Sequence, residues 1–189
     1  MDNKLIIINY LGKHKDDALT MHELSKSTRI PYATFHRTIQ GMKDILHMKL
    51  VGKSKVITLN IQNASIKSYL TISSEEEKKE FLKNNPIISK IALELQTKDI
   101  VLLFGSYAKG SQRESSDIDF LIINQKGEKS ISFSKYELLF KKKINPIFIK
   151  NSELIAMLRE KDENIGKQAL KDQIIINNAE KFWELVLHG

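Results

Sequence analysis

The chain has 189 residues, enough for one large or two small domains, and its 41% apolar and 28% charged residues are typical of a folded protein rather than a disordered one. It contains no cysteine, which excludes disulfides, thiolate metal sites and a cysteine nucleophile. Its formal charge of +7 comes almost entirely from residues 1–74, which hold 11 Lys and Arg against 5 Asp and Glu.

The opening segment is apolar only over Leu5–Ile8, which is too short to span a membrane and lacks a signal-peptide cleavage pattern. We therefore expect a cytoplasmic protein with no membrane partner. The basic N-terminal part fits a nucleic-acid-binding module joined to a nearly neutral second domain, although lysine-rich surfaces also serve solubility alone.

Helical patterns dominate the first 45 residues. Apolar residues at helical spacing over 5–11 predict a first helix that ends at Gly12. Thr20 followed by Glu23 is a capping-box pattern, which predicts the start of a second helix. The pair Ile30-Pro31 ends this helix, because proline disfavours helical backbone at the residue before it.

A third helix is predicted over residues 33–45, where apolar side chains recur on one face. Two extended runs, 49–51 and 56–59, follow around a tip rich in glycine and lysine, which predicts a hairpin. Three helices and a basic hairpin resemble the winged helix-turn-helix proteins. The alternative is a small three-helix domain whose hairpin merely packs against it.

The outer face of the third helix and the hairpin carry groups that can hydrogen-bond to base edges and phosphates. The candidate DNA contacts are Thr34, His36, Arg37, Gln40, Lys53 and Lys55. The winged-helix resemblance implies double-stranded DNA as a partner, and a homodimer where the DNA site is palindromic. The alternative for each residue is an ordinary solvated position on a helix or hairpin.

Residues 73–85 are strongly charged and nearly free of apolar side chains, and Pro86 follows them. We expect this segment to be a charged helical linker. It would separate a winged helix-turn-helix domain at residues 1–72 from a second domain at residues 86–189.

The second domain concentrates its chemical information in one motif. An apolar run over 100–104 predicts a buried strand that ends in Gly105 and Ser106, and ten residues later come Asp117 and Asp119. Glycine lets the backbone approach a phosphate, while the serine hydroxyl and nearby N–H groups bind phosphate oxygens. The aspartates alternate along a strand, so they share a face and can hold Mg²⁺ or Mn²⁺ against a triphosphate.

This segment closely resembles the polymerase-β-like nucleotidyltransferase superfamily, and within it the minimal nucleotidyltransferases. The resemblance covers about residues 86–189 and implies an α/β (α+β) fold. It also implies a nucleoside triphosphate as substrate or ligand, with its nucleoside monophosphate transferred to an acceptor and pyrophosphate released. On this resemblance Gly105 and Ser106 bind nucleotide, and Asp117 and Asp119 are the metal-binding and catalytic residues.

Active members of this family carry a third carboxylate on the strand after the next helix, where it binds the catalytic metal and takes the acceptor's proton. The corresponding strand, residues 144–149, contains no acid. Asn145 is its neutral counterpart, since an amide ligates a metal through oxygen but accepts no proton at neutral pH. Glu153 lies beyond the strand and fits the first turn of a helix. The basic run 141–143 faces either a polyphosphate or solvent.

The remaining pattern completes the domain. Helices are predicted over 131–141, 152–160, 164–170 and 179–187, with a short strand or turn at 174–176.

Three functions compete on these observations. The first is an enzyme that transfers a nucleoside monophosphate to a protein or a small molecule. The second is a DNA-binding transcriptional regulator whose nucleotidyltransferase domain only binds nucleotide or a protein partner. The third, implied by the family resemblance, is an antitoxin-like partner of a small helical toxin. The missing third acid favours the second function, and the intact glycine, serine and aspartate pattern favours the first.

Overall fold

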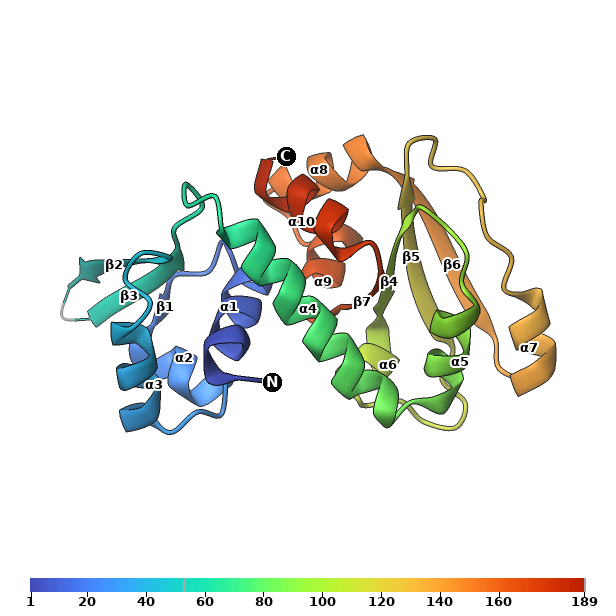
Figure 1. Cartoon of the computed structure of the whole chain (residues 1–189). Helices are drawn as coiled ribbons and strands as arrows, with labels where there is room; N and C mark the ends of the chain where they lie inside the picture. Colours follow the sequence, from blue (N-terminus) through green and yellow to red (C-terminus); the bar gives the residue numbers. More distant parts are fainter. Residues whose placement is uncertain (53, 189) are drawn as a thin grey trace. The chain divides into compact units, whose positions relative to one another are not determined.

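The structure is a computed structural model that describes residues 1–52 and 54–188. The chain divides into two compact units, Met1–Ser73 and Ser74–Gly189. Both units contain helices and strands, in keeping with the expected α/β (α+β) class (Figure 1). None of the described helices is both long enough and apolar enough to cross a bilayer.

The first unit contains three helices and a small antiparallel sheet. Its elements are α1 (Asn3–Lys13), β1 (Leu19–Thr20), α2 (Met21–Ser27), α3 (Tyr32–Gln40), β2 (Leu46–Val51) and β3 (Ser54–Leu59). The strand order is β1-β3-β2, so β3 lies between its hairpin partner β2 and the short β1. Helix α4 (Ile66–Lys83) begins in this unit and continues into the next.

The predicted helix boundaries in this unit hold in part. The capping box is confirmed: Thr20 Oγ1 accepts the backbone N–H of Glu23 at 3.3 Å, and the Glu23 carboxylate accepts that of Thr20 at 2.8 Å. Two predicted ends are wrong. Gly12 lies inside α1, and α3 ends at Gln40, before the weak helix former Gly41.

The second unit is built on a four-stranded mixed sheet. Its elements after α4 are α5 (Pro86–Glu94), β4 (Ile100–Phe104), α6 (Gly105–Lys109), β5 (Ile118–Asn124), α7 (Ser134–Phe140), β6 (Ile144–Lys150), α8 (Asn151–Arg159), α9 (Ile165–Asp172), β7 (Ile174–Asn177) and α10 (Ala179–His188). The strand order is β6-β5-β4-β7. Strand β4 runs antiparallel to β5 and β7, and β6 runs parallel to β5.

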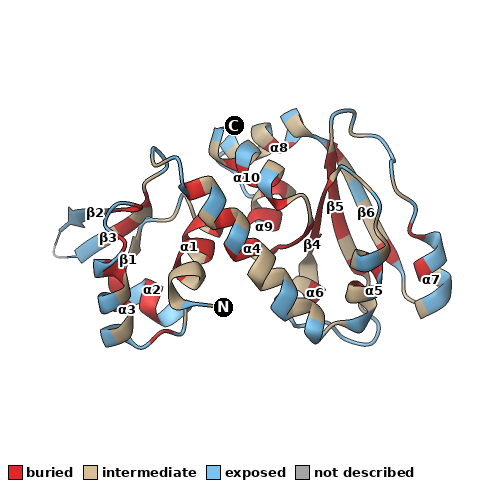
Figure 2. Cartoon of the chain, viewed as in Figure 1, coloured by how far each residue is buried: buried red, intermediate tan, exposed pale blue. Residues whose placement is uncertain are grey.

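The sheet is buried on both faces, and β4 and β5 are its most buried strands (Figure 2). One face packs against apolar side chains of α5, of α7 and of the segment before α7. Helices α8, α9 and α10 contact the sheet as well (Figure 1). The predicted helix start at Ile131 is wrong, because α7 begins at Ser134, yet Ile131 still packs against the core. The apolar side chains packed on both faces of the sheet therefore fix the positions at which its strands end.

The segment predicted as a linker is part of the second unit's packing. Residues 73–83 continue helix α4, and Phe81 and Leu82, both partly buried, pack against the hydrophobic core of the second unit. Ser74 is buried and accepts a hydrogen bond from the indole N–H of Trp183 at 2.9 Å. Residues 73–83 are helical as predicted, but from Ser74 onward the segment belongs to the second unit, and its partly buried Phe81 and Leu82 pack against that unit's core.

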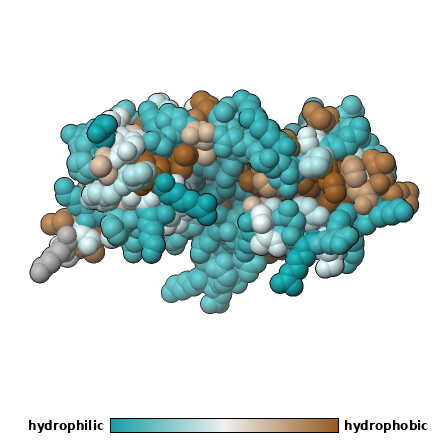
Figure 3. Space-filling model, turned by 90° about the horizontal axis from the view of Figure 1, so that it is seen from below, coloured by the Kyte–Doolittle hydropathy of each residue, from teal (hydrophilic) through white to brown (hydrophobic). Residues whose placement is uncertain are grey.

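The visible surface in Figure 3 is mostly hydrophilic, with hydrophobic side chains in separate groups. The large apolar side chains that the second unit exposes most are Leu93 on α5 and Leu138 and Leu139 on α7. In the first unit they lie mainly on β2, at Leu50 and Val51.

Candidate active site

Strand pairing brings three chain segments to one end of the second unit's sheet. Phe104, the last residue of β4, pairs with Asp119 on the antiparallel β5. Asp119 in turn pairs with Asn145 on the parallel β6. Gly105, which follows Phe104 directly, therefore lies beside the same end of β5. Gly105, Asp119 and Asn145, which come from three separate segments of the sequence, thus meet at one end of the sheet.

Gly105 lies so close to Asp119 that no side chain fits between them. A Cβ built on Gly105 would lie 2.6 Å from Oδ2 of Asp119, well inside any real carbon–oxygen contact. The backbone of Gly105 also has φ +71°, in the left-handed region that glycine adopts without strain. Glycine is required here both for its backbone conformation and for the room it leaves to the carboxylate.

The amide of Asn145 joins the two aspartates. Its Nδ2 donates to Oδ2 of Asp117 at 3.1 Å and to Oδ1 of Asp119 at 3.2 Å. Ile118 between them is fully buried. The prediction that Asp117 and Asp119 share a face while Ile118 points into the core is confirmed. One oxygen from each carboxylate is therefore directed at the same atom, the amide nitrogen of Asn145.

Lys143 supplies a positive charge next to this pair. Its Nζ lies 3.3 Å from Oδ2 of Asp117, on a side chain that remains 69% exposed. The hydrogen bond from Asn145 and, to a smaller extent, the ammonium of Lys143 lower the pKa of Asp117. The basic run 141–143 was expected to face either a polyphosphate or solvent. Within this run, Lys143 contacts Asp117 and so lies at the site where a polyphosphate would bind. Its position two residues before Asn145 was the signal that could have indicated this, because alternate residues of an extended chain share a face.

The loop that leads to Asp117 is held by a tight turn. The backbone N–H of Arg113 donates to the Ser116 hydroxyl at 2.8 Å, and the backbone N–H of Ser116 donates to the Arg113 carbonyl at 3.0 Å. Lys142 Nζ donates to the Glu114 carbonyl of the same loop. These contacts fix the approach of the chain to the first aspartate.

A hollow of about 330 Å³ borders this loop. It is lined by residues 84–88 where α4 ends and α5 begins, by Tyr107 of α6, by residues 112–114 and by Lys142. Its volume is at the small end of the range for ligand pockets. Ser106 precedes Tyr107 and is half-buried on the short helix α6.

The site fits a divalent cation. Magnesium and manganese prefer oxygen ligands, and the two carboxylates each bring one oxygen within 3.2 Å of the position that Asn145 Nδ2 occupies. Turning the Asn145 amide by half a revolution about its Cβ–Cγ bond would exchange Nδ2 for Oδ1 and add a third oxygen. Among residues 1–52 and 54–188, no group of three or more His, Asp or Glu side chains is placed to hold a metal ion. The aspartate pair is thus completed by an amide rather than by another acid.

Glu153 does not join the aspartates. It lies in the first turn of α8 and accepts the backbone N–H of Lys150 at 2.6 Å, at the opposite end of β6 from Asn145. The predicted helix-start position of Glu153 is confirmed.

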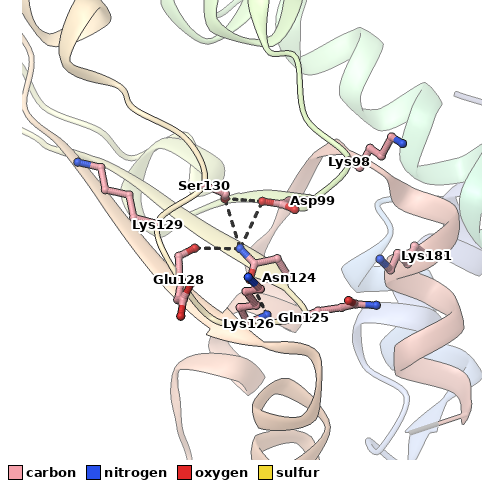
Figure 4. A pocket seen from close by; sticks show the side chains of 9 residues that line it. All are labelled: Lys98, Asp99, Asn124, Gln125, Lys126, Glu128, Lys129, Ser130 and Lys181. Atoms are coloured by element: carbon pink, nitrogen blue, oxygen red, sulfur yellow. Dashed lines mark hydrogen bonds between the residues drawn. The ribbon is translucent and has the colours of Figure 1, made fainter.

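A larger hollow, of about 470 Å³, lies at the other end of β5 (Figure 4). It is lined by Lys98, Asp99, Asn124, Gln125, Lys126, Glu128, Lys129, Ser130 and Lys181. At its centre Asn124 Nδ2 donates to the Glu128 carbonyl at 3.0 Å, and the Ser130 hydroxyl donates to Asp99 at 2.5 Å. Asn124 is the last residue of β5, whereas Asp119 is the second. This hollow is therefore separate from the candidate active site.

The predicted DNA contacts lie on α3 and β3 of the first unit. His36, Arg37, Gln40 and Lys55 are exposed, and Thr34 is half-buried. Lys53 lies outside the described residues.

Two of the described candidates, His36 and Lys55, line a hollow of about 360 Å³. The other residues that line it are Thr20, Met21, His22, Tyr32 and Ser54. The rings of His22 and Tyr32 lie 6.0 Å apart, and those of Tyr32 and His36 lie 6.4 Å apart. Sequence reasoning missed His22 and Tyr32, although each stands at the start of a predicted helix.

Comparison with known proteins supports the same part of the chain. Residues 76–181, more than half of the chain, match the protein-family model described as Polymerase beta, Nucleotidyltransferase. Comparisons with curated proteins and with solved structures gave no match.

Proposed function

The chain belongs to the polymerase beta nucleotidyltransferase family, and from this premise we propose that its second unit transfers a nucleoside monophosphate from a nucleoside triphosphate to an acceptor. The observation that carries the proposal is that the Asp117 and Asp119 carboxylates meet at the Asn145 amide while Gly105 lies directly against Asp119. In the reaction the acceptor's oxygen forms a bond to the α-phosphorus while the bond to pyrophosphate breaks.

The roles of the residues follow from their chemistry. Asp117 and Asp119 would hold Mg²⁺ or Mn²⁺, which when bound neutralises triphosphate charge and aligns the α-phosphate for in-line attack. Gly105 leaves room for the Asp119 carboxylate. The Ser106 hydroxyl and the N–H groups of its turn would bind phosphate oxygens. The neighbouring hollow beside Tyr107 offers space for a further part of a substrate.

Asn145 limits the chemistry that this site performs. Its amide cannot take a proton from an acceptor hydroxyl at neutral pH, so the position gives no general base. General-base catalysis typically contributes 10²- to 10⁴-fold to a rate. We therefore expect slow transfer, and nucleotide binding without transfer is the alternative that Asn145 favours.

The test is to incubate the purified chain with labelled nucleoside triphosphates, magnesium or manganese, and a lysate of its own cells. Transfer predicts a labelled product and pyrophosphate release, both absent for the variant Asp117→Asn/Asp119→Asn. Nucleotide binding without either product would favour the alternative in which the domain only binds nucleotide. A labelled product of equal yield from the double variant would contradict the assigned site.

A second candidate function belongs to the first unit, for which we propose binding to double-stranded DNA. The supporting observation is that His36 and Lys55 line one hollow between α3 and the hairpin, next to exposed Arg37 and Gln40. Because basic residues would contact phosphates, the affinity for DNA should fall steeply as the salt concentration rises. Duplex binding at about 50 mM salt, where this attraction is large, is the expected result. Absence of binding there would contradict the proposal and would favour a protein-interaction role.

A further inference from the structure

The geometry points to a site that takes one divalent cation rather than two. This inference rests on the proposed function of Asp117 and Asp119 and adds to it the number of ions and the residues that limit it. Those residues are Asn145 and Lys143, which flank the aspartate pair with a neutral amide and a positive charge.

The first limit is the missing charge at Asn145. This residue is paired in register with Asp119, and its Nδ2 lies 3.1 and 3.2 Å from the two carboxylates. A carboxylate there would be a third anionic group in contact with both aspartates, whereas the amide carries no charge. Two divalent ions held by shared ligands repel each other, so a second ion needs anionic ligands to offset this repulsion.

No other acidic side chain restores the third charge within residues 1–52 and 54–188, where no three acids or histidines are placed around a common point. Glu153 is used at the start of α8, beyond the far end of β6. The strand β6 itself, with the sequence Ile-Asn-Pro-Ile-Phe-Ile-Lys, contains no acid.

The second limit is the ammonium of Lys143. It lies two residues before Asn145 and contacts Asp117 at 3.3 Å. Two carboxylates and one ammonium leave a single net negative charge at the site. One divalent ion already reverses that charge, so a second would meet a positive centre. Lys143 also competes for Asp117 with the first ion, although its exposure keeps this competition weak.

The test is a titration of the full chain with Mn²⁺ alone, in which free Mn²⁺ is followed by electron paramagnetic resonance. The variant Asp117→Asn/Asp119→Asn gives the baseline for ions bound elsewhere. Above this baseline we expect one ion for the natural chain and two for Asn145→Asp. Lys143→Gln leaves the same net charge at the site as Asn145→Asp but adds no anionic ligand for a second ion, so it should keep one ion and bind it about 1.5- to 5-fold more tightly, as expected for loss of an exposed ion pair.

Lys150→Gln is the matched control. It removes the same charge from the far end of β6, the strand that Lys143 immediately precedes, and should change neither the number of bound ions nor their affinity. Two ions on the natural chain, or one on Asn145→Asp, would overturn the inference while leaving the proposed transfer intact. No ion above the baseline would overturn the metal-dependent function as well. If Asn145→Asp does not fold, the natural chain's count and the affinity of Lys143→Gln decide the question, and unchanged affinity would rule out the role of Lys143.

Discussion

Asn145 donates a hydrogen bond to Asp117 from the neighbouring strand, with 3.1 Å between Nδ2 and Oδ2. This contact stabilises the charged form of the carboxylate and is the main reason why the pKa of Asp117 lies below its ordinary value of 3.8. The amide N–H groups of Asn145 therefore partly offset the repulsion between the Asp117 and Asp119 carboxylates, as a bound cation would do more strongly.

Replacing Asn145 by alanine should raise the pKa of Asp117 toward 3.8, and Lys143→Gln should raise it by less. A carboxyl group with a depressed folded-state pKa adds stability above its unfolded pKa, and this stability is lost as the pH falls through the folded pKa. The stabilising effect of Asn145 should therefore be present at neutral pH and vanish in acid. Carbon-13 NMR of the Asp117 carboxyl during a pH titration measures the shift, and an unchanged midpoint in Asn145→Ala would contradict this assignment.

Two effects of replacing Gly105 can be separated by comparing it with another glycine: the clash of a new side chain with Asp119, and the strain of a non-glycine residue in left-handed backbone. Gly105 and Gly110 both have left-handed backbone, with φ +71° and +67°, but a Cβ on Gly110 would meet nothing within 4 Å. Alanine at either position should cost about 1–2 kcal/mol of unfolding free energy from the backbone. Gly105→Ala should in addition displace the Asp119 carboxylate and weaken Mn²⁺ binding. Denaturant unfolding and Mn²⁺ titration of both variants test this, and equal Mn²⁺ affinities would contradict the steric argument.

For the first unit, Lys55→Ala should weaken duplex binding equally for all sequences and flatten its dependence on salt by about one unit of log–log slope. Arg37→Ala should also blur sequence preference if Arg37 reads a guanine. Lys26→Ala, which removes the same charge from the exposed end of α2 outside the hollow, is the control. Binding titrations at several salt concentrations measure these slopes. If Lys55→Ala and Lys26→Ala behaved alike, the hollow between α3 and β3 would not be a DNA contact.

Strong local patterns explain why much of the fold was predictable. The apolar run of β4 is buried over Ile100–Leu103 and ends at Phe104 as predicted, because its short length, its β-branched residues and the following glycine favour a strand over a helix. The capping box of Thr20 and Glu23 is a contact between neighbours in sequence, so the local pattern suffices to place it. The packing of the charged segment 73–85 was not predictable, because the burial of Ser74 and the contacts of Phe81 and Leu82 depend on residues that are distant in sequence.

The candidate site was predictable where a single segment sets the geometry. Alternation places Asp117 and Asp119 on one face, whatever the rest of the fold does. The absence of an acid on β6 was also visible, but the contact of Asn145 with both aspartates depends on the parallel register of β5 and β6. The pairing of Lys143 with Asp117 depends on the same register. The sequence indicates that Lys143 and Asn145 share a face, but it does not indicate which residues of the neighbouring strand they meet.

The measurement that tests the central claim most directly is equilibrium binding of a nucleoside triphosphate to the full chain, with and without magnesium or manganese. The chain should bind the nucleotide only with the metal, and Asp117→Asn/Asp119→Asn should lose this binding while keeping its fold, since the two removed charges repel each other when no metal is bound. The matched control Asp162→Asn/Glu163→Gln removes two charges from an exposed loop and should bind normally. Unchanged metal-dependent affinity in Asp117→Asn/Asp119→Asn would contradict the assignment of this site.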